Sequence, residues 1–244
     1  MVEKTNCAVI FCGGRGSRLG MIGKKKSKSL LLVNNKPIIH NIINQILKTK
    51  INKIILPLGF KGNDIKNYVK SAFKKNISKF IFVSTGIDTE ISERIIKIKK
   101  HLSPGGFTIF INGDTIFNFN LNSFFKSHLI NKKKISLATF SPKIDLGFVK
   151  VRNKQPVEFK KSIFISKFNI KKNNFLAYSG LMIIDTKYLQ NFQFNNKTDF
   201  ELEMYNKCIK SRGVNVFLIK RGTCFPIDNV KNLIYANKNL NLKN

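Results

Sequence analysis

The residues best suited to chemistry lie near the start of this chain, in the segment 11–28, FCGGRGSRLGMIGKKKSK. Glycines follow a short apolar run there, and a serine and several cations follow the glycines. A glycine-rich turn after a strand lets successive backbone N–H groups point at an anion with no side chain in the way. The segment therefore predicts a site for phosphate groups, with arginine and lysine to neutralise their charge.

Two well-known phosphate loops do not fit this segment. A Walker loop needs a glycine, four further residues and then Gly-Lys-Ser/Thr, and the residues around Gly23 and Lys24 do not match that frame. A dinucleotide-binding loop needs a glycine three residues after Gly16, where Leu19 stands. From these residues alone, another kind of phosphate loop and a generic turn with flanking cations both stay open.

Two aspartates that follow apolar runs could hold a metal ion. Asp114 stands in NGDTIF, and Asp228 stands in CFPIDN near the C-terminal end. Mg²⁺ prefers carboxylate oxygens and would neutralise the charge that grows on a triphosphate during transfer. The chain has only 13 acidic residues against 44 basic ones, so acids at both places favour metal binding. The alternative is helix capping, because VKNL follows shortly after Asp228.

These residues must be positioned by strands and helices that alternate in the first half of the chain. Short apolar runs predict buried strands at 7–12, 53–58, 79–84 and 107–112. Apolar residues at three- and four-residue spacing predict helices at 37–48, 63–75 and 91–102. The alternation implies an α/β fold with a mostly parallel, Rossmann-like central sheet and helices on both faces. Ligands of such sheets bind beyond the carboxyl ends of the strands, which places 13–18, 85–90 and 113–114 along one rim.

The second half of the chain is less regular. We expect strands at 135–140, 147–151, 175–185 and 214–219, a helix at 198–212, and a loop-rich, basic segment at 152–174. There is no internal repeat, linker or break in composition. We therefore expect a single domain, 1–244.

The formal net charge of +31 is typical of proteins that bind nucleic acid or a membrane surface. Lysine and asparagine are, however, spread over the whole chain, and short runs such as 22–28 and 131–134 are usually solvated. We therefore favour a compositional bias over nucleic-acid binding, which stays open as an alternative.

Other features of the composition bear on membrane association and on the cellular compartment of the protein. No apolar stretch approaches the roughly 18 residues of a membrane span, so we expect no membrane partner. The four cysteines, Cys7, Cys12, Cys208 and Cys224, form no CxxC pair and no zinc spacing. We expect reduced thiols and a cytoplasmic location.

The stretch AVIFCGGRGSRL (8–19), followed by KSLLLVNNKPII (28–39), resembles the signature of the sugar-1-phosphate nucleotidyltransferases. That signature is a strand, then G-G-x-G-[ST]-R-[LM], a short basic loop, K-x-[LM] and K-P-[IL]. The resemblance implies a nucleotidyltransferase (GT-A-like) fold with an irregular, β-containing sugar-binding region in the second half. It assigns catalytic roles to Arg18 and Lys28 and the metal to Asp114 and Asp228. It assigns nucleotide binding to Cys12, Gly13, Gly14, Gly16 and Ser17.

Two further segments resemble one branch of this family, the glucose-1-phosphate cytidylyltransferases. They are GFKGNDIKNYV (59–69) and STGIDTEISERI (84–95), and they imply that Thr85 and Arg94 lie near the nucleotide. Ser92 and Glu93 stand where that branch usually has two glycines. The branch implies CTP as the nucleotide.

The second half departs from the family pattern at the sugar site. In place of an E-K-P motif the chain has VEFKKSIF (157–164), and a shift of one residue makes Lys161 the ligand of the sugar phosphate. In place of an N-G-G or N-A-G turn it has AYSGL (177–181), with Tyr178 at the asparagine position. The resemblance thus implies Lys161 and Tyr178 as substrate-binding residues, while the identity of the sugar stays open.

Together these features predict a Mg²⁺-dependent enzyme that transfers CMP from CTP to a sugar 1-phosphate. The nucleotide-binding part would be about 1–130 and the sugar-phosphate part about 131–244. Alternatives are a guanylyl- or thymidylyltransferase acting on mannose, heptose or glucose 1-phosphate, and a non-catalytic nucleotide or nucleic-acid binder. The partners are then small molecules, and a homo-oligomer stays open.

Overall fold

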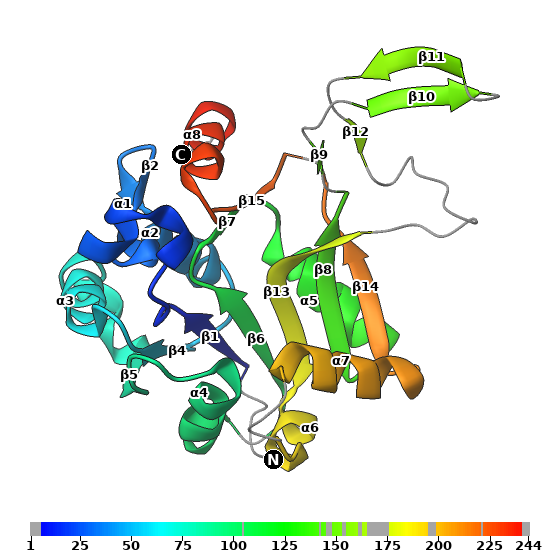
Figure 1. Ribbon diagram of the computed structural model, residues 1–244. Coiled ribbons are helices and arrows are strands. Elements are labelled where there is room, and N and C mark those ends of the chain that lie inside the picture. The colour runs from blue at the N-terminus through cyan, green and yellow to red at the C-terminus, as the bar shows by residue number, and fades with distance from the viewer. Residues whose placement is uncertain are drawn as a thin grey trace.

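The computed structural model describes residues 6–103, 105–141, 143–144, 148–152, 155–160, 163–164, 176–194, 199–220 and 222–240. Its main feature is a seven-stranded sheet (Figure 1) in the order β14, β8, β13, β6, β1, β4, β5. In chain order the strands are β1 (Cys7–Phe11), β4 (Lys53–Leu58), β5 (Phe80–Ser84), β6 (Phe107–Asn112), β8 (Ile135–Phe140), β13 (Ala177–Asp185) and β14 (Val214–Leu218).

The sheet is mostly parallel. Strand β13 runs antiparallel to both of its neighbours, β6 and β8, whereas the remaining pairs in the sheet are parallel. The carboxyl ends of β1, β4, β5, β6 and β8 therefore meet at one edge, and β13 brings its first residues to the same edge. We call this edge the rim.

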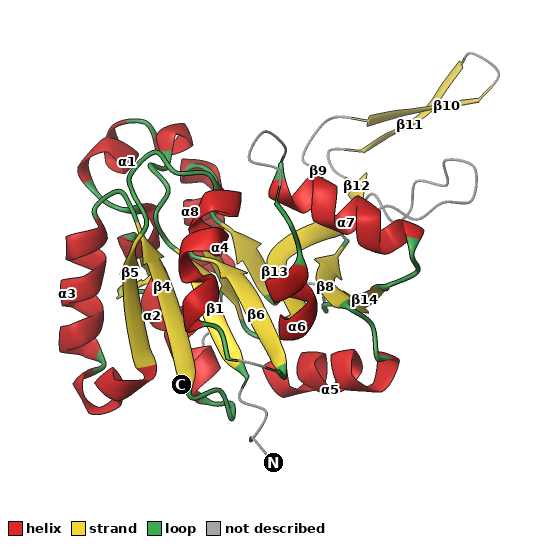
Figure 2. Ribbon diagram, turned by 90° about the horizontal axis from the view of Figure 1, so that it is seen from below, coloured by secondary structure: helices red, strands yellow, loops and turns green. Residues whose placement is uncertain are grey.

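Helices cover both faces of the sheet (Figure 2), and each face has its own apolar core. Successive residues of β1 alternate between the two cores, with Ala8 and Ile10 in one and Cys7 and Val9 in the other. The first core is covered by α2 (Ile38–Leu47), α3 (Gly62–Ala72), α5 (Leu121–Asn131) and α8 (Val230–Asn239). The second is covered by α4 (Ile91–Ile98), α6 (Thr186–Asn191) and α7 (Phe200–Lys210).

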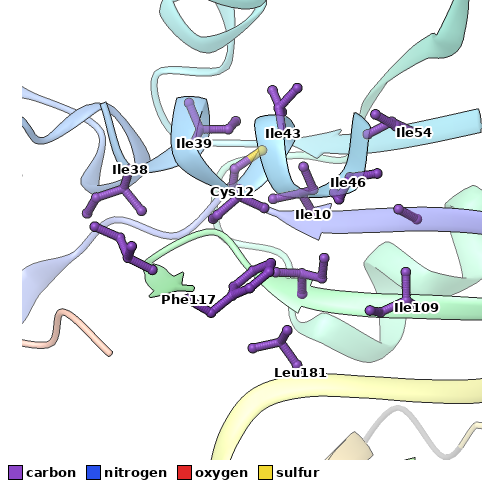
Figure 3. Packing of buried hydrophobic residues seen from close by; sticks show 14 of the residues in the cluster. Ile10, Cys12, Ile38, Ile39, Ile43, Ile46, Ile54, Ile109, Phe117 and Leu181 are labelled. Atoms are coloured by element: carbon purple, nitrogen blue, oxygen red, sulfur yellow. The ribbon is translucent and has the colours of Figure 1, made fainter. Parts of the chain in front are cut away.

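Helix α2 shows how the apolar spacing builds this core. Ile39, Ile43 and Ile46 recur at three- and four-residue spacing and are fully buried. Figure 3 shows them packed over Ile10 of β1 and Ile54 of β4. Burying a side chain of this size contributes about 1.5–3 kcal/mol, so α2 is held mainly by its packing.

The expected fold class, a mostly parallel sheet with helices on both faces, is confirmed. The strands expected at 53–58, 107–112 and 135–140 coincide with β4, β6 and β8. The expected helix at 91–102 is α4 followed by a 3₁₀ turn at Lys99–His101. Helix α5 was not expected from the sequence.

The prediction of a loop-rich segment at 152–174 is wrong for part of its length. An antiparallel pair forms between β10 (Phe148–Arg152) and β11 (Gln155–Lys160), and another between β9 (Lys143–Ile144) and β12 (Ile163–Phe164). Residues 165–174 and Lys161 lie outside the described residues. β9 and β12 have only two residues each, too few for an alternation to be visible.

The remaining short elements lie near the rim or connect the larger ones. Two short antiparallel pairs are β2 (Leu32–Val33) with β3 (Lys36–Pro37) and β7 (Thr115–Phe117) with β15 (Cys224–Pro226). None of the helices in the described part of the chain is long and apolar enough to cross a membrane. The other short elements are α1 (Met21–Lys25) and the 3₁₀ turns at Ser17–Leu19, Lys28–Leu30 and Lys74–Lys79.

Candidate active site

The site expected from the strand order lies between β1 and β6. After β1 the chain continues to β4 on one side, and it later returns to β6 on the other side of β1. The loops after these two strands therefore diverge, and in open α/β sheets the crevice between such loops is where ligands bind. The glycine-rich turn follows β1, and Asp114 follows β6.

The glycine-rich turn is built tightly around two glycines. Gly16 has φ of 64°, a left-handed conformation that favours glycine, and its carbonyl accepts a hydrogen bond of 3.0 Å from the Leu19 backbone N–H. Gly13 is packed so closely that a Cβ there would collide with the Arg94 guanidinium and lie 2.9 Å from the Gly59 nitrogen. Gly14 differs, because a Cβ added there would meet nothing within 4 Å. The turn is therefore closed on its inner side and open beside Gly14.

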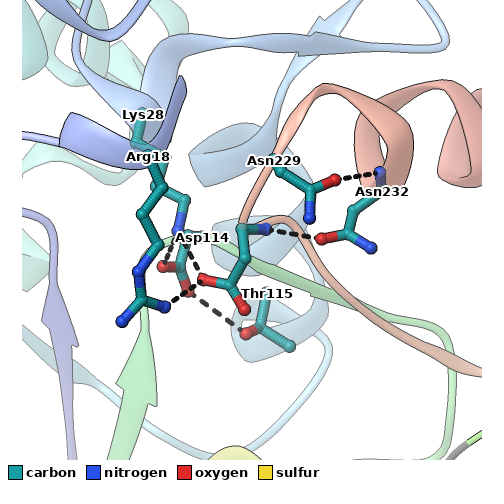
Figure 4. A network of polar contacts seen from close by, with 7 residues as sticks. Arg18, Lys28, Asp114, Thr115, Asn229 and Asn232 are labelled. Carbon is teal, nitrogen blue, oxygen red and sulfur yellow. Dashed lines mark hydrogen bonds and ion pairs between the residues drawn. The ribbon is translucent and has the colours of Figure 1, made fainter. Parts of the chain in front are cut away.

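Lys28 joins the two aspartates that the sequence predicts as metal ligands. Its Nζ donates to Asp114 Oδ2 at 2.6 Å and to Asp228 Oδ1 at 3.1 Å (Figure 4). These two carboxylates, 114 positions apart in sequence, thus converge on one ammonium group. The Lys28 side chain is mostly buried, and its Cβ lies 3.4 Å from the position of a Cβ added to Gly16. The cluster is therefore held against the glycine-rich turn.

The pairing of β7 with β15 brings the two aspartates together. Thr115 of β7 pairs with Pro226 of β15, and the Ile227 backbone N–H continues the contact by donating to the Asp114 carbonyl at 2.9 Å. Asp114 precedes β7 directly, and Asp228 follows Ile227. The short ladder therefore fixes both carboxylates at the same point of the rim.

Helix capping does not occupy the Asp228 carboxylate. Asn229 caps α8, because its side chain accepts the Asn232 backbone N–H at 2.9 Å. Asp228 contributes only its backbone N–H, which donates to the Asn232 side chain at 3.1 Å (Figure 4). Its carboxylate is left for Lys28 and Arg18.

Arg18 lies at the exposed side of this cluster. Its Nη1 is 3.8 Å from Asp228 Oδ1, and its side chain is 80% exposed. A contact of this length between half-exposed groups adds little to stability. The guanidinium is therefore available to an anion that enters from the solvent.

Thr85 and Arg94, expected near the nucleotide, lie beneath the turn. Arg94 is only 5% exposed. Its Nη1 donates to Thr85 Oγ1 at 2.7 Å, its Nε to the Thr89 carbonyl at 3.0 Å, and its Nη2 to the Gly13 carbonyl at 3.4 Å. The Thr85 hydroxyl donates in turn to the Leu58 carbonyl at 2.8 Å. These side chains thus tie the loop after β5 to the turn after β1, and burial lowers the pKa of Arg94.

The remaining predicted residues fall in different places. The thiol of Cys12 is buried in the core beside α2 (Figure 3), and burial raises its pKa to about 12, so only its backbone faces the turn. The Tyr178 ring packs edge-on against Tyr205 of α7, with ring centroids 5.8 Å apart, and burial raises its pKa. Lys161 lies outside the described residues, as does the side chain of Ser17.

Comparison with known proteins identifies the family. The model of the family described as nucleotidyl transferase matches residues 7–218. The chain belongs to the nucleotidyl transferase family. The resemblance found in its sequence is thereby confirmed at the level of the family.

Relatives of this nucleotidyl transferase match it over most of its length. It is 24% identical, over 95% of its own length and 94% of the relative's, to a Bacillus subtilis protein named "Probable glucose-1-phosphate cytidylyltransferase". It is 28% identical to a D-glycero-alpha-D-manno-heptose 1-phosphate guanylyltransferase from Aneurinibacillus thermoaerophilus, over 71% and 75% of the two chains. In fold it is similar to a Bacillus anthracis crystal structure described as a "Putative Glucose-1-Phosphate Thymidylyltransferase", with a TM-score of 0.73, 20% identity and coverage of 96% and 94%.

The donor set of this nucleotidyl transferase fits a divalent cation that is shared with a substrate. Within the described ranges no group of three or more His, Cys, Asp and Glu side chains could hold a metal by itself. Asp114 and Asp228 do supply two converging carboxylates. Mg²⁺ is commonly held by one or two carboxylates, with substrate phosphates and water as the other ligands.

Sequence reasoning missed one pair at the rim of this nucleotidyl transferase. Arg15, inside the glycine-rich turn, donates from Nε and Nη2 to the two carboxylate oxygens of Asp88 at 2.6 and 2.8 Å. These hydrogen bonds lower the pKa of the Asp88 carboxyl. The only sequence signal is that each residue stands in a loop of the expected rim, at 13–18 and 85–90.

Proposed function

We propose that this protein transfers a nucleoside monophosphate from a nucleoside triphosphate to a sugar 1-phosphate and releases pyrophosphate. The observation that carries the proposal is the convergence of Lys28, Asp114 and Asp228 beside the glycine-rich turn, in the crevice between β1 and β6. Cations and carboxylates in one place are what a reaction between two phosphate compounds requires.

In the proposed reaction a phosphate oxygen of the sugar 1-phosphate attacks the α-phosphorus of the triphosphate. The bond from the α-phosphorus to the bridging oxygen breaks, and pyrophosphate leaves with that oxygen. No residue needs to form a covalent intermediate. Catalysis then consists of positioning the two phosphates and stabilising the charge that develops on them.

The residues of the site divide this work among them. Backbone N–H groups of Gly13, Gly14, Gly16 and Ser17 are proposed to bind the triphosphate. Arg18 and Lys28 are proposed to stabilise the transferring phosphoryl group, because Arg18 is open to solvent and Lys28 lies at the crevice.

Asp114 and Asp228 would hold Mg²⁺. When bound, the cation would neutralise charge on the phosphate oxygens. Lys28 engages one oxygen of each carboxylate in the structure, and we propose that it leaves at least one of them when the substrates bind. Lys28 is then free to contact a phosphate.

The acceptor is proposed to be a sugar 1-phosphate because relatives that match most of the chain are named for such acceptors. Lys161 and Tyr178 are proposed to bind it. Incubation with CTP, GTP, UTP or dTTP, together with Mg²⁺ and a panel of glucose, mannose and heptose 1-phosphates, tests the proposal by mass spectrometry. A product with the mass of a nucleotide-sugar supports it, and the absence of any such product across the panel overturns it.

Among the nucleotides we propose CTP. The segments 59–69 and 84–95 resemble the cytidylyltransferase branch, and the relative that carries that name matches 95% of the chain. GTP is the second candidate, because guanylyltransferases are also among the relatives. With a fixed sugar phosphate, kcat/KM for CTP should exceed that for UTP, dTTP and GTP by at least about tenfold. A preference for GTP or dTTP would overturn the assignment of the base and leave the transferase in place.

A further inference from the structure

The loops after β1, β4 and β5 meet at one point of the rim. A Cβ added to Gly59 would lie 2.6 Å from the Gly13 carbonyl oxygen and 2.7 Å from that of Gly86. Three glycines from three loops are therefore in close contact, with Arg94 packed beneath them. Glycine has no side chain, so these three residues form a surface of backbone atoms beside Gly14, where an added Cβ would meet nothing within 4 Å.

The side chains that flank this surface are Arg15, Phe60 and Asp88. Arg15 and Asp88 form the bidentate pair across the loops, and the Arg15 guanidinium carbon lies 5.8 Å from the centre of the Phe60 ring. The side chains of Arg15 and Asp88 are 56% and 71% exposed, respectively. The edge of this surface thus carries two donors and two acceptors that a ligand can reach.

Stability does not account for this pair. An ion pair this exposed contributes little to the free energy of unfolding, and a ligand can replace it at little loss. A carboxylate near a triphosphate site is also unfavourable by simple charge repulsion, in a chain that has few acids. A carboxylate at this position is therefore best explained by a ligand group that donates hydrogen bonds to it.

The position along the sheet points to the nucleobase. Phosphates bound by the glycine-rich turn and the Lys28 cluster lie over β1 and β6, and Asp88 follows β5, two strands beyond β1. Two interstrand spacings are about 10 Å, which is comparable with the reach of a ribose and a base from the α-phosphate. A triphosphate anchored at the turn can therefore bring the edge of its base to Arg15 and Asp88.

We propose that Arg15 and Asp88 form the edge that reads the nucleobase, and that they select a base with an exocyclic amino group. The proposal rests on the proposed function only in requiring that a nucleoside triphosphate binds at the turn. Cytosine offers a donor at its amino group and acceptors at N3 and O2. These groups match a carboxylate oxygen of Asp88 and two guanidinium N–H groups of Arg15.

Uracil and thymine do not match this edge. Their pattern is acceptor, donor, acceptor, so either a carbonyl oxygen faces a carboxylate oxygen or a guanidinium N–H loses its acceptor. Guanine matches the pair in the opposite order, with O6 toward Arg15 and its N1–H and amino group toward Asp88. The pair therefore separates amino-bearing bases from uracil and thymine, and ring size must separate cytosine from guanine.

Equilibrium binding without a sugar phosphate tests this proposal, because no transfer can occur. Dissociation constants for CTP, UTP and GTP are measured by calorimetry with Mg²⁺, for the wild type and for Asp88→Asn, Arg15→Lys and the control Asp64→Asn. Asp64 is an exposed acid in the first turn of α3. The wild type should bind CTP at least about tenfold more tightly than UTP, because uracil leaves a donor or an acceptor of this edge unmatched.

Asp88→Asn should lower the CTP preference over UTP by about tenfold, because an amide can also donate to a carbonyl oxygen. Arg15→Lys keeps the charge but loses the planar fork, so it should lower the same preference while UTP affinity changes by less than about threefold. Asp64→Asn should change neither the preference for CTP over UTP nor the affinity for UTP. A preference that survives both rim variants, or a wild type that binds UTP as well as CTP and GTP, overturns the proposal.

The two proposals fail in different ways. A base preference that depends on Asp88 in a protein that makes no nucleotide-sugar supports the reading edge and overturns the transferase. Nucleotidyl transfer by a protein whose base preference does not depend on Asp88 supports the transferase and overturns the reading edge. A preference for GTP that is lost in Asp88→Asn supports the reading edge and overturns cytosine as the base.

Discussion

At the scale of single residues, the site depends on how Lys28 is shared. One ammonium group balances two carboxylates that would otherwise repel each other at the rim. The glycine-rich turn, Lys28 and both aspartates were all predicted from the sequence, because each stands in a recognisable local motif. The Arg15–Asp88 pair was not, since contact between two loops 73 positions apart leaves no local pattern.

Replacing Lys28 should change metal binding as well as catalysis. Lys28→Met removes the cation that competes for the Asp114 and Asp228 oxygens, so Mn²⁺ should bind about tenfold more tightly in the absence of nucleotide. Transfer should meanwhile fall by a factor of about 100 or more. Electron paramagnetic resonance of free Mn²⁺ measures the first effect, and Lys24→Met, an exposed lysine of α1, is the matched control. Unchanged or weaker Mn²⁺ binding would show that Lys28 and the metal do not share these oxygens.

Arg18→Ala separates catalysis from stability. Its side chain is 80% exposed and makes only a 3.8 Å ion pair, so the melting temperature should stay within about 1–2 °C of the wild type. Loss of a charge that acts in the transition state should lower kcat by a factor of about 100 to 10,000. Steady-state rates and thermal unfolding of the same samples measure both quantities. A variant that unfolds early but retains its rate would make Arg18 a structural residue.

At the scale of elements, short and irregular pieces complete the site. The pair of β7 and β15 holds both aspartates, yet each strand has only three residues, too few for the sequence to show an alternation. Helix α5 was missed because one of its core-facing positions is a histidine. Leu121, Phe124 and Phe125 are buried together with His128, so the apolar spacing breaks where the helix continues.

The cap of α8 provides a test of how Asp228 is used. Asn229→Ala removes the capping acceptor and should lower the free energy of unfolding by about 1 kcal/mol, or the melting temperature by about 2–4 °C. Asp228→Asn keeps the backbone N–H that contacts Asn232, and should change stability by less than about 0.5 kcal/mol while it removes activity. Thermal unfolding of the two variants shows which of the two residues caps α8. A larger loss of stability in Asp228→Asn than in Asn229→Ala would make Asp228 the cap.

His128 should make the fold sensitive to acid. Burial lowers the pKa of this side chain, an effect that Asp185 partly offsets, and its Nδ1 lies 2.9 Å from Ser136 Oγ on β8. The unfolded state therefore binds a proton more readily, so stability is full above the ordinary pKa of 6.5 and is lost as pH falls through it.

Urea unfolding at pH 7.5 and 5.5 checks this expectation. The histidine-dependent part of the pH effect should be smaller in His128→Asn, whose amide can keep a hydrogen bond to Ser136 without titrating. His40 and His101 also have lowered pKa values because of burial and remain in both proteins. An equal pH effect in the variant and the wild type would exclude His128 as a contributor.

At the scale of the whole molecule, the first half follows its sequence more closely than the second. Strands buried on both faces and amphipathic helices alternate from β1 to β6, and each has a period that the sequence displays. The second half contains the antiparallel β13, which pairs with the distant β6, and the strands β9 and β12, which have two residues each and show no period. The single-domain organisation and the two parts about 1–130 and 131–244 remain predictions.

The charge of the whole molecule gives its acids a particular meaning. With 13 acidic residues against 44 basic ones, an acid at any given position is uncommon. Asp88, Asp114 and Asp228 nevertheless all lie at the rim, and each is paired with a cation there. In a chain so rich in lysine, carboxylates gathered at one edge mark where a metal and a base are expected to bind.

The most direct test measures pyrophosphate release by the wild type and by Asp114→Asn. Common nucleoside triphosphates are combined with a panel of sugar 1-phosphates and Mg²⁺. The wild type should release pyrophosphate only when both substrates are present, in an amount equal to the nucleotide-sugar formed. Asp114→Asn should be at least about 1,000-fold slower. No release that depends on a sugar phosphate, or undiminished release by Asp114→Asn, would contradict this cluster as the place of nucleotidyl transfer.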